Sequence, residues 1–139
     1  MTLSASHISH EKKQMRRSSL IFFCITLFCG LFSAVYEYFS YGVYSNYMVY
    51  LFLFPFIGGV LPYAVLGLAP HIQCPLKFSS RLYNSGVATL TLGSCVKGVL
   101  DIYGTTSVYT PVYWLVGAML VVIGIAVYFI GTGRRKAEI

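Results

Sequence analysis

Three charged side chains stand inside or at the edge of apolar stretches, where an ionisable group is a candidate for function. Lys97 and Asp101 are four residues apart, so they share one face of a helix. Glu37 lies at the end of another apolar stretch, at a similar depth. A cluster of the three would pair charges that are costly to leave bare in a low-dielectric setting. It either fastens two helices together or forms the floor of a polar site at the outer surface.

A run of aromatic residues recurs every three positions and is the second candidate. Amphipathic rings prefer the level of the lipid headgroups, so the run is typical of an aromatic belt. If the rings and hydroxyls converge instead, they form a platform for a headgroup, a quinone or a planar cofactor. The residues concerned are Tyr38, Tyr41, Tyr44, Tyr47 and Tyr50.

Two prolines enclose a glycine pair in the second apolar stretch, at Pro55, Gly58, Gly59 and Pro62. Proline removes a backbone donor, so we expect this stretch to kink or break. Broken helices expose carbonyl groups to ions or substrates in many transporters. A kink whose freed backbone groups are satisfied by neighbouring helices is the other interpretation.

The cysteines and histidines form no recognisable redox or metal motif. The four cysteines include no C-x-x-C pair, and the three histidines lie outside the apolar stretches or at their edge. His71 and Cys74 could ligate a metal together with His7 and His10, but their spacing matches no closed zinc site. We therefore expect no metal, no cofactor and no catalytic residue.

These candidate residues must be positioned by apolar helices. Of the 139 residues, 57% are hydrophobic and 10% are charged, which is too little polar surface to cover a globule in water. About 20 mostly apolar residues are enough to span a bilayer as a helix. Four such stretches occupy residues 18–38, 47–69, 82–103 and 111–131. The sequence predicts an all-α integral membrane protein with a four-transmembrane-helix bundle.

The third predicted helix should be the most enclosed, because it carries the polar residues Asn84, Lys97 and Asp101. Small residues allow two helices to approach closely. A seam of this kind is predicted for the fourth helix by Gly117, Gly124 and Gly131, which are seven residues apart.

The basic residues predict the orientation, since cytoplasmic connections carry the excess of Lys and Arg. They occur in residues 1–17, 70–81 and 132–139 and are absent from residues 39–46 and 104–110. Both termini and the middle connection are then cytoplasmic in a multi-pass protein of the cell membrane. Residues 1–17 and 132–139 are cytoplasmic basic tails that attract anionic lipid headgroups, and residues 18–131 form the membrane domain.

The formal charge of +6 does not indicate nucleic acid as a partner. Basic residues that flank apolar stretches follow from membrane orientation alone, and no basic stripe lies on a foldable soluble surface. With few polar groups available for a site, we expect a non-enzymatic subunit or accessory protein of a membrane complex. Its partner would be another membrane protein or a second copy of the chain.

Two other functions are compatible with the sequence. One is a small-molecule or ion transporter that uses the broken second helix and the cluster of Glu37, Lys97 and Asp101. The other is a redox component associated with a quinone or a flavin. In helix number and size the chain resembles the small multidrug-resistance transporters. Their glutamate belongs near the middle of the first helix, whereas Glu37 lies at its end.

Overall fold

A computed structural model describes residues 2–69 and 72–138, with side chains from residue 5 onward. Helices make up 83% of the chain, and the described residues contain no strand. Two helical segments, Ala5–Phe39 and Thr110–Ala137, are long and apolar enough to cross a membrane. The helices are α1 (Thr2–Phe39), α2 (Asn46–Val49), α3 (Leu53–Pro55), the π-helical segment η1 (Phe56–Val60), α4 (Leu61–Leu68), α5 (Lys77–Ile102) and α6 (Thr110–Ala137).

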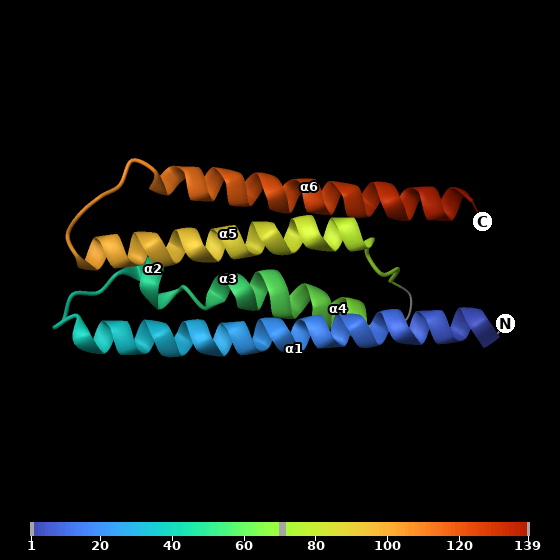
Figure 1. The fold of residues 1–139 in the computed structure, drawn as a ribbon, viewed down its shortest axis with the longest axis horizontal. Helices are drawn as coiled ribbons and strands as arrows, with labels where there is room; N and C mark the ends of the chain where they lie inside the picture. The colour runs from blue at the N-terminus through green and yellow to red at the C-terminus, as the bar shows by residue number, and fades with distance from the viewer. Residues whose placement is uncertain (1, 70–71, 139) are drawn as a thin grey trace.

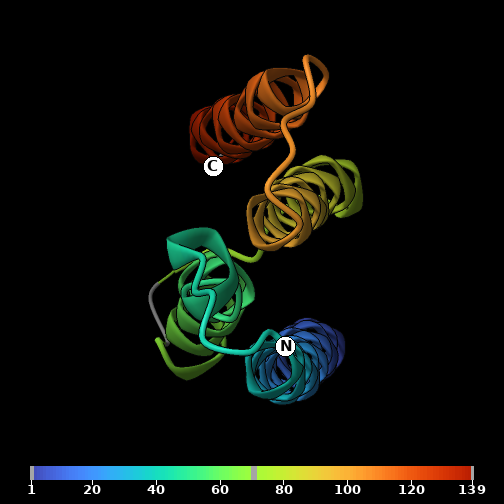
Figure 2. The ribbon, with the colours of Figure 1, turned by 90° about the vertical axis from the view of Figure 1, so that its left-hand side faces the viewer.

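The helices stand side by side in an open row and do not close around a common core (Figures 1 and 2). Helix α1 packs on the second helical stretch, from α2 to α4, and the backbone of α6 approaches that of α5 alone. The Trp114 ring of α6 also meets the rings of Tyr47 and Phe54 in the second stretch. Helix α5 contacts α2, α3 and η1 on its other side, so it is an inner member of the row. The outermost helices, α1 and α6, do not touch each other. The expected bundle is therefore an open layer.

Helix α1 is much longer than the first predicted span, because it begins at Thr2 instead of residue 18. Residues 2–29 contain neither proline nor glycine, so nothing in the chain interrupts the helix. Met15 is buried and packs in one cluster with Phe22, Tyr63 and Val87. Residues 5–17 thus continue α1 as a helix, and Met15 is the buried residue among them.

The second stretch is helical from Leu53 to Leu68 but changes its hydrogen bonding between the two prolines. Within η1 the Leu61 amide donates to the Phe56 carbonyl, which is the i−5 pattern of a π-helix. Pro62 has no amide hydrogen, which removes one α-helical bond at this place. On α1, the Ser19 hydroxyl donates to the Val60 carbonyl over 3.3 Å. This hydrogen bond ties α1 to the end of η1.

Helices α5 and α6 meet along a seam of glycines, as the heptad spacing predicts. Gly117 and Gly124 are buried on α6 and face α5. An added Cβ at Gly124 would lie 2.8 Å from the Tyr83 amide nitrogen. At the same level, the Ser79 hydroxyl donates to the Gly124 carbonyl over 2.7 Å. The missing side chains let the two backbones approach each other.

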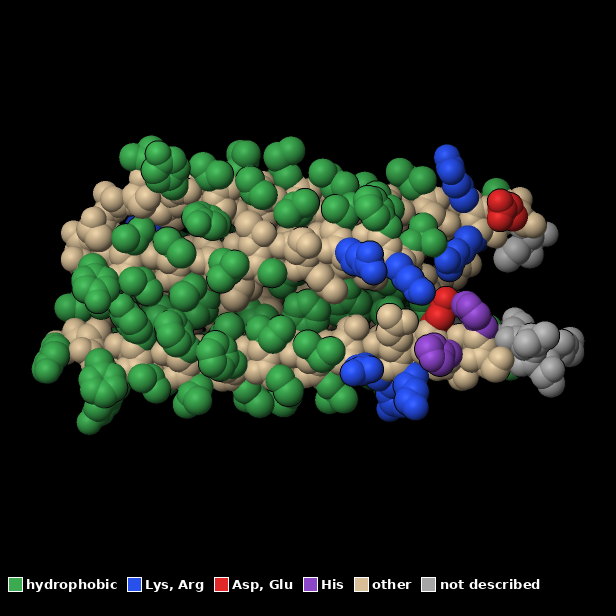
Figure 3. All heavy atoms as spheres, in the orientation of Figure 1, with side chains coloured by type: hydrophobic (Ala, Val, Ile, Leu, Met, Phe, Trp, Pro, Cys, Tyr) green, Lys and Arg blue, Asp and Glu red, His purple; other side chains and the backbone are tan. Residues whose placement is uncertain are grey.

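Most of the charged side chains on the face seen in Figure 3 gather at one end of the row, and apolar side chains are spread over the rest of it. This end, here called the basic end, contains both termini and the connection between α4 and α5 (Figure 1). The opposite end, here called the tyrosine end, contains residues 40–45 and 103–109. The basic residues of the basic end are Lys12, Lys13, Arg16, Arg17, Lys77, Arg81, Arg134, Arg135 and Lys136.

Candidate functional site

At the tyrosine end, the structure brings together two of the three charges singled out in the sequence. The Lys97 ammonium donates to the Asp101 carboxylate over 2.5 Å. The Ser45 hydroxyl donates to the other carboxylate oxygen over 3.2 Å. The Lys97 ammonium also lies 5.7 Å from the ring centroid of Tyr47, within the range of a cation–π contact. The pair thereby ties α5 to the connection that precedes α2.

Glu37 does not join this pair. One of its carboxylate oxygens is buried and has no hydrogen-bond partner among the described residues. The Ser40 hydroxyl bonds only to backbone carbonyls, those of Glu37 and Val43. The proposed three-residue cluster is therefore a Lys97–Asp101 pair and a separate carboxylate.

Removal of one partner of the pair should cost more stability than removal of both. Lys97→Met leaves the Asp101 carboxylate without its cation, while Lys97→Met with Asp101→Leu leaves no charge. Both side chains are about one quarter exposed, at 25% and 28%, so solvent screening limits the loss to about 1 kcal/mol. Thermal unfolding in detergent should show that the double variant recovers most of the stability that Lys97→Met loses. A double variant as unstable as Lys97→Met would contradict a net role for the pair.

Beside Lys97 lies an open depression of about 590 Å³. Its walls include Tyr47 and Trp114, whose rings meet edge to face at 6.0 Å. The Thr110 hydroxyl oxygen in this wall is buried and has no partner among the described residues. The depression is lined by Tyr47, Lys97, Thr106, Ser107, Thr110, Pro111, Trp114 and Leu115.

The structure does not gather the five tyrosines around one space. Tyr41 is fully exposed and Tyr38 is 84% exposed, and Tyr44 and Tyr50 also have most of their surface free. Only Tyr47 reaches the depression beside Lys97. Rings that point outward in this way fit the level of a membrane interface. They do not form a shared pocket.

The proline–glycine segment is packed, not open. Gly59 is buried, and an added Cβ there would overlap the Phe22 ring of α1. Gly58 faces α5, where an added Cβ would lie 3.0 Å from a Val87 methyl carbon. Both glycines therefore serve close packing on the two neighbouring helices.

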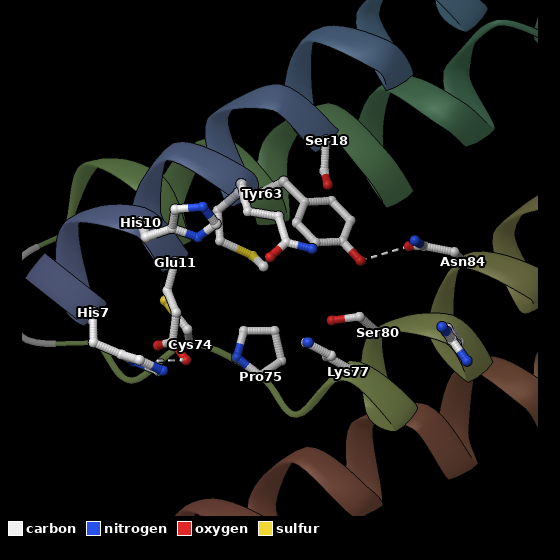
Figure 4. A pocket seen from close by; sticks show the side chains of 13 residues that line it. His7, His10, Glu11, Ser18, Tyr63, Cys74, Pro75, Lys77, Ser80 and Asn84 are labelled. Carbon is white, nitrogen blue, oxygen red and sulfur yellow. Dashed lines mark hydrogen bonds and ion pairs between the residues drawn. The ribbon is translucent and has the colours of Figure 1, made fainter.

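A cavity lined by polar and charged side chains lies at the basic end, between α1, α4 and α5 (Figure 4), and is here called the basic-end cavity. Its volume is about 320 Å³. Helix α1 supplies one wall, and the start of α5 with Tyr63 of α4 supplies the other. The lining residues are His7, His10, Glu11, Gln14, Met15, Ser18, Tyr63, Cys74, Pro75, Lys77, Ser80, Arg81 and Asn84.

Tyr63 crosses from α4 to α5 at the deep side of this cavity. Its hydroxyl donates to the Asn84 side-chain oxygen over 2.5 Å, and its ring stacks on Phe22 with centroids 5.6 Å apart. The Ser80 hydroxyl oxygen is buried close by and has no partner of hydrogen-bond geometry among the described residues. The backbones of α4 and α5 do not approach each other. The gap between them is thus closed by side chains.

The charges around the basic-end cavity leave an excess of positive groups. His7 Nδ1 lies 3.5 Å from the Glu11 carboxylate. No acidic side chain of the described chain pairs with Lys77 or Arg81. Burial, together with the nearby Glu11 carboxylate, raises the pKa of the Cys74 thiol above its usual value. Cys74 is therefore a protonated thiol at neutral pH, which is a weak nucleophile.

The sequence reading missed this cavity, although a signal for it exists. The polar residues of α1 recur at helical spacing in His7, Glu11, Gln14 and Ser18, and those of α5 recur in the same way in Lys77, Ser80, Arg81 and Asn84. Each set lies on one face of its helix. Because the sequence predicts residues 1–17 to be a cytoplasmic tail, it does not place the polar face of α1 against that of α5.

No group of three or more His, Cys, Asp or Glu side chains in the described residues could hold a metal ion. His71, one of the weak metal candidates, lies outside those residues. Comparison with known proteins yields no matching family model, no matching curated protein and no matching solved structure.

Proposed function

We propose that the chain spans the cell membrane four times, with both termini in the cytoplasm. Helices α1, α5 and α6 are each longer than the roughly 30 Å of the bilayer core. The shortest of them, α5, has 26 residues and a length of about 39 Å. The stretch from α2 to α4 forms the second span. Nine of the ten basic residues lie at the basic end, which the positive-inside rule assigns to the cytoplasm (Figure 3).

Within the membrane, we propose that the protein acts as a non-enzymatic subunit of a complex. The observation that carries this proposal is the open row, which leaves the outer helices packed on one side only. In α6, 11% of the most apolar 18-residue window is buried. An open layer of helices has broad apolar faces on which the helices of another subunit can pack. Its partner is another membrane protein or a second copy of this chain.

Photo-crosslinking from α6 tests the subunit proposal. A photoreactive residue at Met119, which is 56% exposed, should yield one discrete protein adduct in the native membrane. The same residue at Glu138, beyond the end of α6, is the control and should yield no adduct of that mass. Lipid adducts alone at Met119, together with a monomer in native lipid particles, would contradict the proposal.

A small transporter is the second candidate, favoured by polar spaces at both ends of the row. The basic-end cavity and the depression beside Lys97 share no lining residue, so they are separate spaces. Transport would require a rearrangement that connects them. Uptake by proteoliposomes that is lost in both Lys97→Met and Asn84→Leu would support this candidate over the subunit.

A further inference from the structure

An apolar groove adjoins the basic-end cavity on the other side of Tyr63. The groove has a volume of about 410 Å³ and runs between α4, α5 and α6. Tyr63, Pro75 and Ser80 line both spaces. The groove is lined by Pro62, Tyr63, Leu66, Ile72, Pro75, Ser79, Ser80, Tyr83, Gly124, Ile125, Tyr128 and Phe129. A polar and an apolar compartment thus share one wall, which is made of side chains.

The polar compartment suits a phosphate group. Lys77 and Arg81 reach it without an acidic partner among the described residues, and the Ser80 hydroxyl, which lies near the Tyr63 hydroxyl, makes no hydrogen bond of good geometry there. The Glu11 carboxylate also lines this compartment and lies 3.5 Å from His7 Nδ1. Figure 4 shows the Lys77 ammonium and the Ser80 hydroxyl turned toward the space in front of Tyr63. Charge-assisted bonds from Lys and Arg are the usual means of holding phosphate oxygens. In the proposed orientation this compartment lies near the cytoplasmic headgroup level.

The apolar compartment suits an acyl chain. Leu66 of α4 and Ile125 and Phe129 of α6 form its sides, and Ile125 and Phe129 are exposed to the surroundings of the row. The groove is therefore open to the side, where the bilayer would lie. The connection between α4 and α5, which contributes Ile72 and Pro75 to the groove, is held to α6. The Tyr128 hydroxyl donates to the Gln73 carbonyl over 3.1 Å.

We propose that this composite site binds one anionic phospholipid, with its phosphate beside Lys77 and Arg81 and an acyl chain in the groove. The lipid enters from the side, and because the side chains of Tyr63, Pro75 and Ser80 separate the two spaces, its phosphate reaches Lys77 and Arg81 when this wall moves aside. This inference rests on the proposed membrane span of the chain. It adds a defined lipid site to the general attraction of basic tails for anionic membranes.

Native mass spectrometry of the full chain in a non-ionic detergent tests the site. With equal amounts of phosphatidylglycerol and phosphatidylcholine, the wild type should retain one phosphatidylglycerol in preference. Lys77→Gln with Arg81→Gln should lower that preference about thirtyfold, since each basic group near anionic lipid contributes about 1 kcal/mol. Arg134→Gln with Lys136→Gln removes the same charge from exposed positions of the basic end and should retain the preference.

The groove has its own matched pair of variants. Ile125→Trp fills the groove and should abolish lipid retention, whereas Ile123→Trp lies outside it and should not; the two isoleucines are 42% and 43% exposed. Soluble glycerol phosphate should fail to displace the lipid. Displacement by it would show a phosphate site without a chain site and would overturn the inference.

Two further results bear on the inference in different ways. Equal losses in both charge variants would mean diffuse attraction and would overturn the lipid site while the membrane span stands. Release of the protein from membranes by alkaline carbonate without detergent would instead overturn the membrane span itself. The two failures are therefore distinguishable.

Discussion

Replacement of Gly86 with alanine should destabilise the protein by about 1–3 kcal/mol, because it overpacks the seam between α5 and α6. The added Cβ would lie 2.7 Å from the Val121 amide nitrogen and 3.0 Å from the Gly117 carbonyl oxygen. Both atoms belong to the backbone, so no side-chain rotation relieves the contact. The two helices must separate, and the backbone of α6 approaches no other described helix.

Thermal unfolding in detergent measures this loss, with Gly133→Ala on α6 as the control. An added Cβ at Gly133 meets nothing within 4 Å, so that variant should be as stable as the wild type or slightly more stable, given the helix propensity of alanine. If Gly86→Ala unfolds at the wild-type temperature, the close seam between α5 and α6 is incorrect.

Replacement of Gly59 with alanine should have an effect of similar size at the contact between α1 and η1. The new Cβ would overlap the Phe22 ring close to where it joins the backbone, so the ring cannot turn away at its free end. Phe22 is buried and stacked on Tyr63, which leaves it no empty space. A shift of α1 would also disturb the wall of the basic-end cavity.

The neighbouring glycine gives the comparison for this variant. An added Cβ at Gly58 would meet only Val87 side-chain atoms, at 3.0 Å and beyond. Gly58→Ala should therefore cost less than Gly59→Ala in the same unfolding measurement. Equal losses would indicate that both glycines act through the flexibility of η1, as a helix break requires, and not through packing.

Hydrophobic pattern predicted the helical regions and the glycine seam, because both depend on residues close together in one helix. It did not predict the row, since the choice between a row and a bundle depends on which faces meet. Asn84 illustrates the difference: its polarity indicates that the third predicted helix is enclosed, but only the structure identifies Tyr63 as its partner. Neither the spacing of the polar residues nor the composition of the chain indicates that Tyr63 and Asn84 are partners.

For a similar reason, the sequence predicted the contact between Lys97 and Asp101 but not the separate position of Glu37 or the arrangement of the tyrosines. The spacing of Lys97 and Asp101 fixes their common helix face, so their contact follows from local geometry. Glu37 belongs to another helix, and its depth along the chain does not determine which way it faces. The regular spacing of the tyrosines likewise indicated a common role, but the chain turns at Tyr41, whose φ is 53°, and the rings diverge.

The central claim is that the row crosses the membrane four times with the basic end inside the cell. Labelling of introduced cysteines by a membrane-impermeant maleimide in intact cells tests it most directly, in a chain with Cys74 replaced by alanine. The same chain without an introduced cysteine, which keeps Cys24, Cys29 and Cys95, gives the background. Three exposed positions receive the cysteine. Thr106→Cys lies at the tyrosine end, and Ile72→Cys and Lys136→Cys lie at the basic end. We expect Thr106→Cys to be labelled in intact cells, and the other two only after permeabilisation. Labelling of Ile72→Cys in intact cells would place the connection between α4 and α5 outside and contradict the four-span topology.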